Sequence, residues 1–255
     1  MKILLTNDDG IFADGICALY EALYQEHEVY IVAPDSEKSA VGHAITIHCP
    51  LIVTRVKRGK HFWGYAVNGT PADCVKLAIY EIVGEVDLVI SGINRGANVG
   101  INILYSGTVS AATEANLLGY PSIAVSIDGY KDLDYCFPAN FIAEFIIEMK
   151  ELFFYNSPIC LNINFPNINP NLIRGIKTVR QSTAPIKEFF DRRIDPHGRI
   201  YYWQGAEEHL EEAPDTDVIA LKQGYITITP IKFDFTNYEF LPLIEKYLRR
   251  KLQSF

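Results

Sequence analysis

Short apolar runs alternate with longer segments of helical period through the first half of the chain. Four runs have the length and β-branched content of buried strands: Ile3–Thr6, Glu28–Ala33, Asp87–Ser91 and Ser122–Ser126. Between and after these runs, apolar residues recur at helical spacing, as at Ile16, Leu19, Tyr20 and Leu23 and again at Phe141, Ile142, Phe145, Ile146 and Met149. This alternation predicts a parallel sheet with helices on both faces.

One helix start is marked by its capping residues. Thr70 is a favourable N-cap residue, Pro71 suits the first helical position, and Asp73 places an acid in the first turn. Together they predict a helix over about Ala72 to Val83.

The pattern changes after residue 155, where strands follow one another without intervening helices. Strands are predicted over Ile159–Asn164 and Gly175–Arg180, and DPHG at residues 195–198 is predicted as the tip of a projecting hairpin. An amphipathic helix is predicted over about Asn237 to Leu252. The fold class is therefore α/β: a doubly wound, mostly parallel, Rossmann-like sheet in three layers, with a C-terminal β-hairpin arm and a terminal helix. We expect residues 1–255 to form a single domain with its core over about 1–155.

Composition and charge narrow the classes of function. The chain has 255 residues, 49% of them hydrophobic, which is ample for a core. Its net charge of −8 disfavours binding to a nucleic acid duplex but still allows a small phosphorylated ligand. Five cysteines without a CxxC pair favour a reducing compartment over a disulfide framework or a thiolate zinc site. With no signal-peptide pattern and no apolar run near 18 residues, we expect a cytoplasmic protein without membrane contact.

The first predicted strand ends in the turn sequence Asn7, Asp8, Asp9 and Gly10, at the edge where doubly wound folds bind ligands. A plain turn that caps the next helix is one interpretation of this composition. A cap, however, needs one carboxylate, and two adjacent carboxylates repel each other by roughly 1 kcal/mol even in water. The pair therefore indicates a hard, oxygen-binding cation such as Mg²⁺, Mn²⁺ or Ca²⁺.

Two later segments add candidate ligand groups. SGINRGANVG, residues 91–100, matches neither a Walker loop nor a dinucleotide fingerprint, and a plain strand-to-helix connection is the alternative. Its glycines let the backbone approach a ligand closely, and the side-chain carbonyl of Asn94 would add a neutral ligand to a metal ion. In YSGTVSAATEA, residues 105–115, Ser106, Gly107 and Thr108 could form an anion cradle at a helix N-terminus, or Ser106 or Thr108 could simply be its N-cap.

TNDDG, APDSEKSAVGHAIT, VNGTPADCV, SGINRGANVG and YSGTVSAATEA, in this order and at these intervals, closely resemble motifs of the SurE family of stationary-phase survival nucleotidases. The resemblance covers about residues 1 to 130. It implies hydrolysis of nucleoside 5′- and 3′-monophosphates to nucleoside and phosphate in the cytoplasm, with polyphosphate hydrolysis left open. It also implies one divalent metal ion, Mg²⁺ or Mn²⁺, for which Ca²⁺ could substitute in a crystal.

Position by position, the resemblance implies metal ligands at Asp8, Asp9, Ser39 and Asn94, and phosphate-binding residues at Asn98, Ser106, Gly107 and Thr108. His43 stands where we expect a small polar residue, so it is either a solvated histidine or a group that touches the substrate or protonates the leaving group. The family further implies that the hairpin and terminal helix, within about residues 156–255, exchange between subunits to give dimers or tetramers.

These residues suggest metal-assisted, in-line attack of water on phosphorus, with Asp8, Asp9 and Asn94 as catalytic residues. Asp9 is a candidate for positioning or deprotonating the water, and Asn98 with the helix-end amides would stabilise the developing charge. A haloacid-dehalogenase-like mechanism fails because Gly10 stands where that class needs a second aspartate. A noncatalytic nucleotide or metal sensor remains the alternative, which turnover would distinguish.

Overall fold

A sheet of nine strands forms the centre of the protein, in a computed structural model that describes residues 1–58, 61–153, 155, 157–206 and 213–252. The strand order is β3-β4-β2-β1-β5-β6-β7-β11-β8, and neighbours are parallel except in the pairs β3/β4 and β7/β11. The strands are β1 (Lys2–Thr6), β2 (Glu28–Pro34), β3 (Val53–Arg58), β4 (His61–Val67), β5 (Leu88–Arg95), β6 (Ser122–Ile127), β7 (Cys160–Phe165), β8 (Ile176–Thr178) and β11 (Ile226–Pro230).

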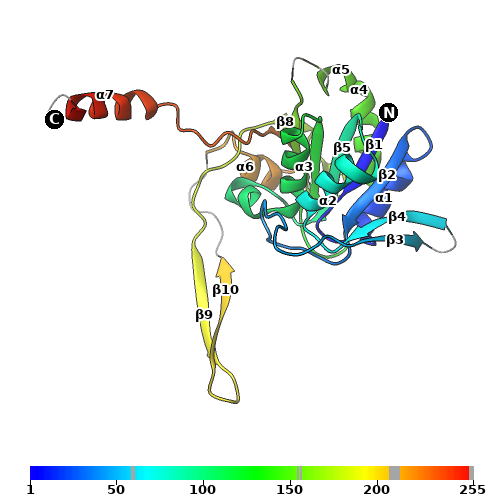
Figure 1. Cartoon of the computed structure of the whole chain (residues 1–255), viewed down its shortest axis with the longest axis horizontal. Coiled ribbons are helices and arrows are strands. Elements are labelled where there is room, and N and C mark those ends of the chain that lie inside the picture. Colours follow the sequence, from blue (N-terminus) through cyan, green and yellow to red (C-terminus); the bar gives the residue numbers. More distant parts are fainter. Residues whose placement is uncertain (59–60, 154, 156, 207–212, 253–255) are drawn as a thin grey trace.

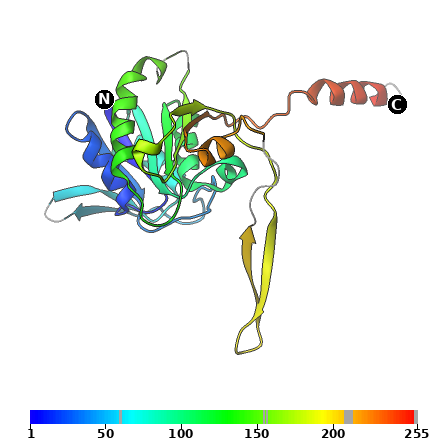
Figure 2. The same cartoon turned by 180° about the vertical axis from the view of Figure 1, so that it is seen from behind.

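Helices cover both faces of this sheet (Figure 1 and Figure 2). On one face, α1 (Asp14–Leu23) and α4 (Cys136–Glu148) pack in one hydrophobic core, and on the other, α2 (Pro71–Leu77) and α3 (Gly107–Leu117) pack in a second. The short helical elements are α5 (Lys150–Phe153), α6 (Asp217–Lys222), η1 (Ala78–Ile82), η2 (Gly100–Tyr105) and η3 (Pro170–Leu172). The predicted doubly wound α/β class is confirmed.

Strand β1 shows why the sequence folds this way. Its residues Ile3 and Leu5 belong to the core under α1 and α4, whereas Leu4 belongs to the core under α2 and α3. Successive side chains of a strand point to opposite faces, so a continuous apolar run is what a strand covered on both sides requires.

Helix α2 begins as its capping residues predict. The Thr70 hydroxyl accepts a hydrogen bond from the Asp73 backbone N–H at 3.1 Å, and the Asp73 carboxylate accepts one from the Thr70 N–H at 2.9 Å. The α-helix ends earlier than predicted, at Leu77, and the chain continues through Ile82 as the wider turn η1.

The second half differs from the sequence prediction in two respects. The strands after residue 155 were predicted to follow one another without intervening helices, but helix α6 lies between β10 and β11. The terminal helix α7 (Leu241–Leu252) begins four residues later than predicted. Within the described residues, none of the helices is long and apolar enough to cross a membrane.

Two elements project from the body. Strands β9 (Glu188–Ile194) and β10 (Ile200–Ala206) pair antiparallel as a separate hairpin, with the predicted tip at residues 195–198. The hairpin and α7 extend away from the sheet in different directions (Figure 1 and Figure 2).

Candidate functional site

A cavity of about 360 Å³ lies at the carboxyl ends of the parallel strands. Six residues predicted for the site line it: Asp8, Asp9, Ser39, Asn94, Asn98 and Ser106. They come from the ends of β1 and β5, the loop after β2, and the start of α3. Ligands bind at this edge in open α/β sheets because loops from separate strands converge there.

The turn after β1 presents the two acids. The Asn7 side-chain N–H donates to the carbonyl of Gly10 at 2.8 Å and closes the turn. Gly10 has a φ of +99°, a conformation that favours glycine. The backbone N–H of Lys38 donates to the carbonyl of Asp8 at 2.8 Å, which holds the loop after β2 against the acid pair.

The start of α3 positions Asp8. The Thr108 hydroxyl donates to Asp8 Oδ1 at 2.5 Å, and Thr108 is fully buried. A Cβ atom at Gly107 would lie 2.8 Å from Asp8 Cβ and 2.9 Å from Asp8 Oδ2, so the carboxylate occupies space that only glycine leaves open. Gly107 and Thr108, predicted from the family as phosphate-binding, therefore contact Asp8, and Thr108 Oγ1 is occupied by that acid.

Both acids lie where negative charge is disfavoured. Burial, reinforced by the neighbouring charge of Asp9, raises the pKa of Asp8 to about 6, against the opposing effect of the Thr108 hydrogen bond. Burial also raises the pKa of Asp9, as does the charge of Glu37, while the backbone N–H of Arg95 at 3.2 Å acts in the opposite direction. A cation at this place would offset both effects.

Asn94 and Ser39 complete the oxygen set. Pairing of β5 with β6 is interrupted between Ser91 and Asn94, an irregularity of the kind that redirects a strand near a site. The Asn94 side-chain N–H donates to the carbonyl of Gly96 at 2.7 Å, which leaves Oδ1 as the atom available to a ligand. The Ser39 hydroxyl donates to Glu37 Oε1 at 2.6 Å, so its lone pairs remain available.

The donor set fits a hard divalent cation. Two carboxylates, a hydroxyl and an amide carbonyl supply oxygen only, which suits Mg²⁺ or Mn²⁺ better than zinc. No cluster of three or more His, Cys, Asp or Glu residues with metal-binding geometry occurs in the described part of the chain. The oxygen set at the acidic cavity thus differs from a histidine or thiolate site in kind.

Asn98 is held by a buried group of polar side chains that the sequence analysis missed. The Asn98 backbone N–H donates to Asn164 Oδ1 at 2.8 Å, and its carbonyl accepts from Asn162 Nδ2 at 2.7 Å. The Asn98 side-chain N–H donates to Ser126 Oγ at 2.8 Å. Asparagine at alternate positions of the otherwise apolar strand CLNINF was the available signal, because buried amides need partners.

A buried acid fixes the next turn. Asp217, at the start of α6, accepts hydrogen bonds from the backbone N–H groups of Gly100 at 2.9 Å and Ser182 at 2.8 Å. The bond to Gly100 spans 117 positions of the sequence and joins the start of α6 to the start of η2. This role of Asp217 was also missed, since α6 itself was not predicted.

The N-terminus of α3 supplies both a cap and anion-binding amides. Ser106 Oγ accepts a hydrogen bond from the Val109 N–H at 3.1 Å, so the expected N-cap is Ser106. The hydroxyl proton of Ser106 remains available to donate. The first amides of a helix carry partial positive charge and bind anions, so one residue can serve both purposes.

His43 does not line the acidic cavity. Its Nε2 lies 2.7 Å from Glu114 Oε2 and its Nδ1 lies 3.3 Å from the Thr113 hydroxyl, both on α3. Lys76 of α2 pairs with the other Glu114 oxygen at 2.9 Å. The placement of His43 gives no support to the predicted contact with substrate; it anchors the loop that carries Ser39.

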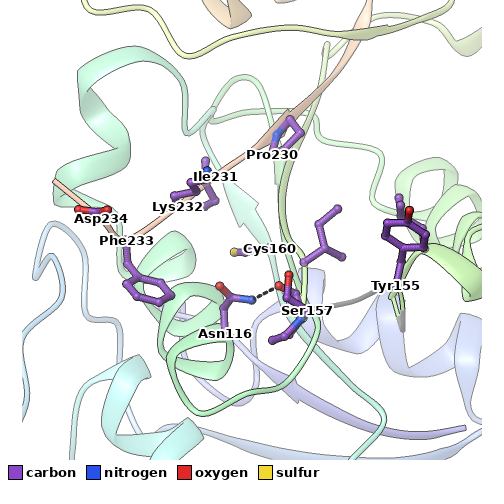
Figure 3. A pocket seen from close by; sticks show the side chains of 12 residues that line it. Asn116, Tyr155, Ser157, Cys160, Pro230, Ile231, Lys232, Phe233 and Asp234 are labelled. Atoms are coloured by element: carbon purple, nitrogen blue, oxygen red, sulfur yellow. Dashed lines mark hydrogen bonds between the residues drawn. The ribbon is translucent and has the colours of Figure 1, made fainter. Parts of the chain in front are cut away.

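A second, more apolar cavity of about 500 Å³ lies at the amino ends of β6 and β7, away from the acids. Figure 3 shows the rings of Phe233 and Tyr155 on opposite sides of it, and the Asn116 side chain donating to the carbonyl of Pro158 at 2.9 Å. Its lining includes one carboxylate, Asp234, and no acid pair. The larger cavity is therefore not the candidate site.

Fold and site together define a doubly wound α/β protein that can hold a hard divalent cation next to an anion at the carboxyl edge of its sheet. The particular family follows from comparison with known proteins. The family model described as "Survival protein SurE" matches residues 3–188, and the chain belongs to the SurE family.

Close relatives agree with this assignment over nearly the whole length. The chain is 50% identical to the "5'-nucleotidase SurE" of Syntrophobacter fumaroxidans over 252 residues, covering 97% of this chain and 99% of that protein. It is also 50% identical to the protein of that name from Syntrophus aciditrophicus, over 98% and 95% of the two chains. The crystal structure of the SurE protein from Aquifex aeolicus superposes with a TM-score of 0.80 at 40% identity, covering 98% of this chain and all of that one.

Proposed function

We propose that this protein is a metal-dependent phosphomonoesterase that hydrolyses nucleoside 5′-monophosphates to nucleoside and phosphate. The observation that carries the proposal is the acid pair of buried Asp8 and half-buried Asp9, which line one cavity with Asn98 and the start of α3. The name 5'-nucleotidase, carried by relatives that are 50% identical, supports the substrate class. Hydrolysis of 3′-monophosphates and of short polyphosphates belongs to the same proposal, since both present a terminal phosphoryl group.

Asp8, Asp9, Ser39 and Asn94 would hold one divalent ion, Mg²⁺ or Mn²⁺, through oxygen atoms. Divalent-metal dependence is general in the SurE family, which supports this assignment. When bound, such an ion polarises a phosphoryl oxygen and makes a bound water more acidic.

The remaining groups act on the phosphoryl oxygens and the water. Asn98 and Ser106 line the cavity together with the start of α3, where donors can bind the charge spread over the equatorial oxygens. Asp9 Oδ2 accepts the Arg95 N–H, and Oδ1 is the oxygen available to orient or deprotonate water. Because Asn98 is held by buried amides, it is pre-positioned and needs little reorganisation during the reaction.

Phosphate release tests the proposal. We expect release from adenosine 5′-monophosphate with Mg²⁺ or Mn²⁺, and near-complete loss with a chelator that is reversed when metal is restored. Thermal unfolding with and without metal gives a readout that needs no activity, because an ion that binds only the folded state raises the midpoint. Binding of the nucleotide without release of phosphate under every metal condition would instead establish the noncatalytic sensor.

We also propose a homo-oligomer, a dimer or tetramer, built through the C-terminal elements. The α7 helix carries apolar side chains that are exposed in the single chain, among them Leu241, Ile244 and Leu248. The hairpin likewise exposes Phe190, Tyr202 and Trp203. Exposed apolar surface of this kind usually marks an interaction site. Most protein oligomers are built from copies of one chain, so we propose a second copy as the partner.

A further inference from the structure

Two exposed aromatic rings stand in the wall of the acidic cavity and have no part in metal or phosphate binding. Tyr130 follows the carboxyl end of β6 and is 75% exposed, and Tyr105 ends η2 and is 55% exposed. Both line the same cavity as Asp8 and Asn98. Large aromatic side chains left open to solvent at a ligand cavity provide apolar contact area for a bound molecule.

The Tyr130 ring is held in place by the glycine-rich loop after β5. A Cβ atom at Gly96 would lie 3.1 Å from both Cε1 and Oη of Tyr130, so the ring lies directly against the Gly96 backbone. The Gly96 N–H donates to the carbonyl of Ile127 at 2.9 Å, which joins this loop to the segment that leads to Tyr130. The ring is thus supported on the protein side, while most of the residue stays open to the cavity and solvent.

Tyr105 is tied to the other side of the site. Its carbonyl accepts a hydrogen bond from the Gly42 N–H at 3.0 Å, which links it to the loop that carries Ser39. The next residue is Ser106, the N-cap of α3. A phosphate bound at that helix start would therefore place the rest of its ester next to Tyr105.

We infer that Tyr105 and Tyr130 form a stacking platform for the nucleobase of the substrate. This inference rests on the proposed function and extends it, because it names the residues that separate nucleotides from other phosphate esters. The polar residues of the cavity are matched to the metal and phosphate, whereas a planar base needs apolar faces. Stacking of a base on an aromatic side chain contributes about 1–3 kcal/mol and tolerates every base, so the platform favours nucleotides over sugar phosphates without selecting one base.

A comparison of two substrates tests the platform. Adenosine 5′-monophosphate and ribose 5-phosphate share the phosphoryl group and the sugar and differ in the base. We expect Tyr130→Ala and Tyr105→Ala each to lower kcat/KM for adenosine 5′-monophosphate by about 5- to 150-fold, the equivalent of one lost stacking contact. The loss should fall mainly on KM, while kcat/KM for ribose 5-phosphate stays within about twofold. Tyr130→Phe and Tyr105→Phe retain the ring and should keep most of the activity on both substrates.

The controls separate this inference from the proposed function. Tyr80→Ala removes a ring that is 66% exposed on η1 and lies outside the cavity. This variant should leave kcat/KM unchanged for both substrates. Calorimetry with adenosine, which has no phosphate, reports base binding without catalysis: the wild type should bind and the alanine variants should bind more weakly. Equal losses on both substrates, or unchanged affinity for adenosine in the variants, would overturn the platform. A wild type that releases no phosphate from any nucleotide contradicts the proposed function instead, and adenosine binding then still decides the role of the tyrosines.

Discussion

Asp8 is an acid held in place against its own electrostatic preference. It is 7% exposed, lies next to a second carboxylate, and accepts a hydrogen bond from Thr108 at one oxygen. Burial of a charged group favours its neutral form, and this effect raises its pKa to about 6. Such an arrangement is costly for a protein that only needs a turn, and useful for one that binds a cation.

Asp8→Asn removes this negative charge and nearly preserves the shape of the side chain. Asp8→Asn should lower metal affinity and phosphate release by at least roughly 100-fold, since even the outer partners of metal ligands contribute about 10- to 100-fold. The metal-free variant should be as stable as the wild type or more so, because repulsion with Asp9 is removed. Calorimetric metal titration, phosphate release and thermal unfolding with chelator measure the three quantities.

A matched control is Glu26→Gln, which neutralises an exposed acid in the turn after α1 and outside the cavity. It should leave metal affinity and turnover unchanged. If Asp8→Asn folds and retains wild-type metal binding and turnover, Asp8 does not belong to the site.

At this scale, the acid pair could be recognised from sequence, because adjacent carboxylates at a strand end have few structural uses. The contacts of Thr108 and Gly107 with Asp8 could not. These contacts depend on how closely α3 packs against the end of β1. The two segments are about 100 residues apart in the sequence, so no local pattern encodes their packing. Tyr130 was missed for a similar reason: an exposed tyrosine is ordinary until its position next to Gly96 is known.

Glu114 connects three segments that shape the site: helix α3, helix α2 and the loop after β2. Its side chain on α3 is 6% exposed and pairs with Lys76 of α2 and with His43 of the loop after β2. That loop is also held at Thr46, whose N–H and hydroxyl donate to Asp73 at 3.0 and 2.6 Å. Ser39 therefore sits on a loop without regular structure that is nonetheless fixed at two later points.

Removal of the Glu114 charge should loosen this connection. Glu114→Gln is expected to lower the free energy of unfolding by about 1–3 kcal/mol at neutral pH, as for a lost hydrogen bond to a charged group. Burial alone would raise the pKa of Glu114, but the hydrogen bonds from His43 and Lys76, together with the charge of Lys76, outweigh burial and keep that pKa below its ordinary value of 4.5. The carboxylate thus stabilises the fold above pH 4.5, and this contribution is lost as the pH falls through the lowered pKa.

Denaturant unfolding of both proteins between pH 3 and pH 7 measures the effect. The difference between wild type and Glu114→Gln should be largest near neutral pH and should shrink below pH 4.5. Thr113→Ala is the matched control, because it removes a neighbouring hydroxyl near His43 without touching the carboxylate. A difference that stays constant across this range would show that Glu114 does not contribute through its charge.

The elements themselves were predicted with uneven success, and the reason is burial. Strands such as β1 and β6, covered on both faces, are continuous apolar runs and were found within one residue of their ends. Strand β3, with the sequence VTRVKR, was not predicted. It lies at the sheet edge with most of its residues exposed, so burial in a core does not impose an apolar pattern on it. The buried asparagines of β7 show the converse, since they are explained only by Asn98 on a loop more than 60 residues away.

The whole molecule consists of a body that buries its own apolar side chains and two extensions whose apolar side chains remain exposed. The body encloses both hydrophobic cores and the acidic cavity. The hairpin and α7 extend beyond it (Figure 1) and carry exposed aromatic and aliphatic side chains. The sequence pattern could predict that the arm projects, and the exposure of its aromatic rings is what motivates the proposed contact with a second copy.

Deletion of the hairpin tests whether the arm assembles the protein. Residues 187–204 can be deleted and the flanking residues joined by two glycines. The ends of the hairpin lie side by side, since Glu188 pairs with Ala206. Sedimentation velocity should show a smaller assembly than the wild type, while circular dichroism and metal-dependent thermal stabilisation of the body persist. The double variant Phe190→Ser and Trp203→Ser keeps the arm but removes two exposed rings, and it should reduce assembly in the same direction if apolar contact holds the copies together. An oligomer of unchanged size in both proteins would show that the arm has no part in assembly, and would leave α7 as the element that joins the subunits.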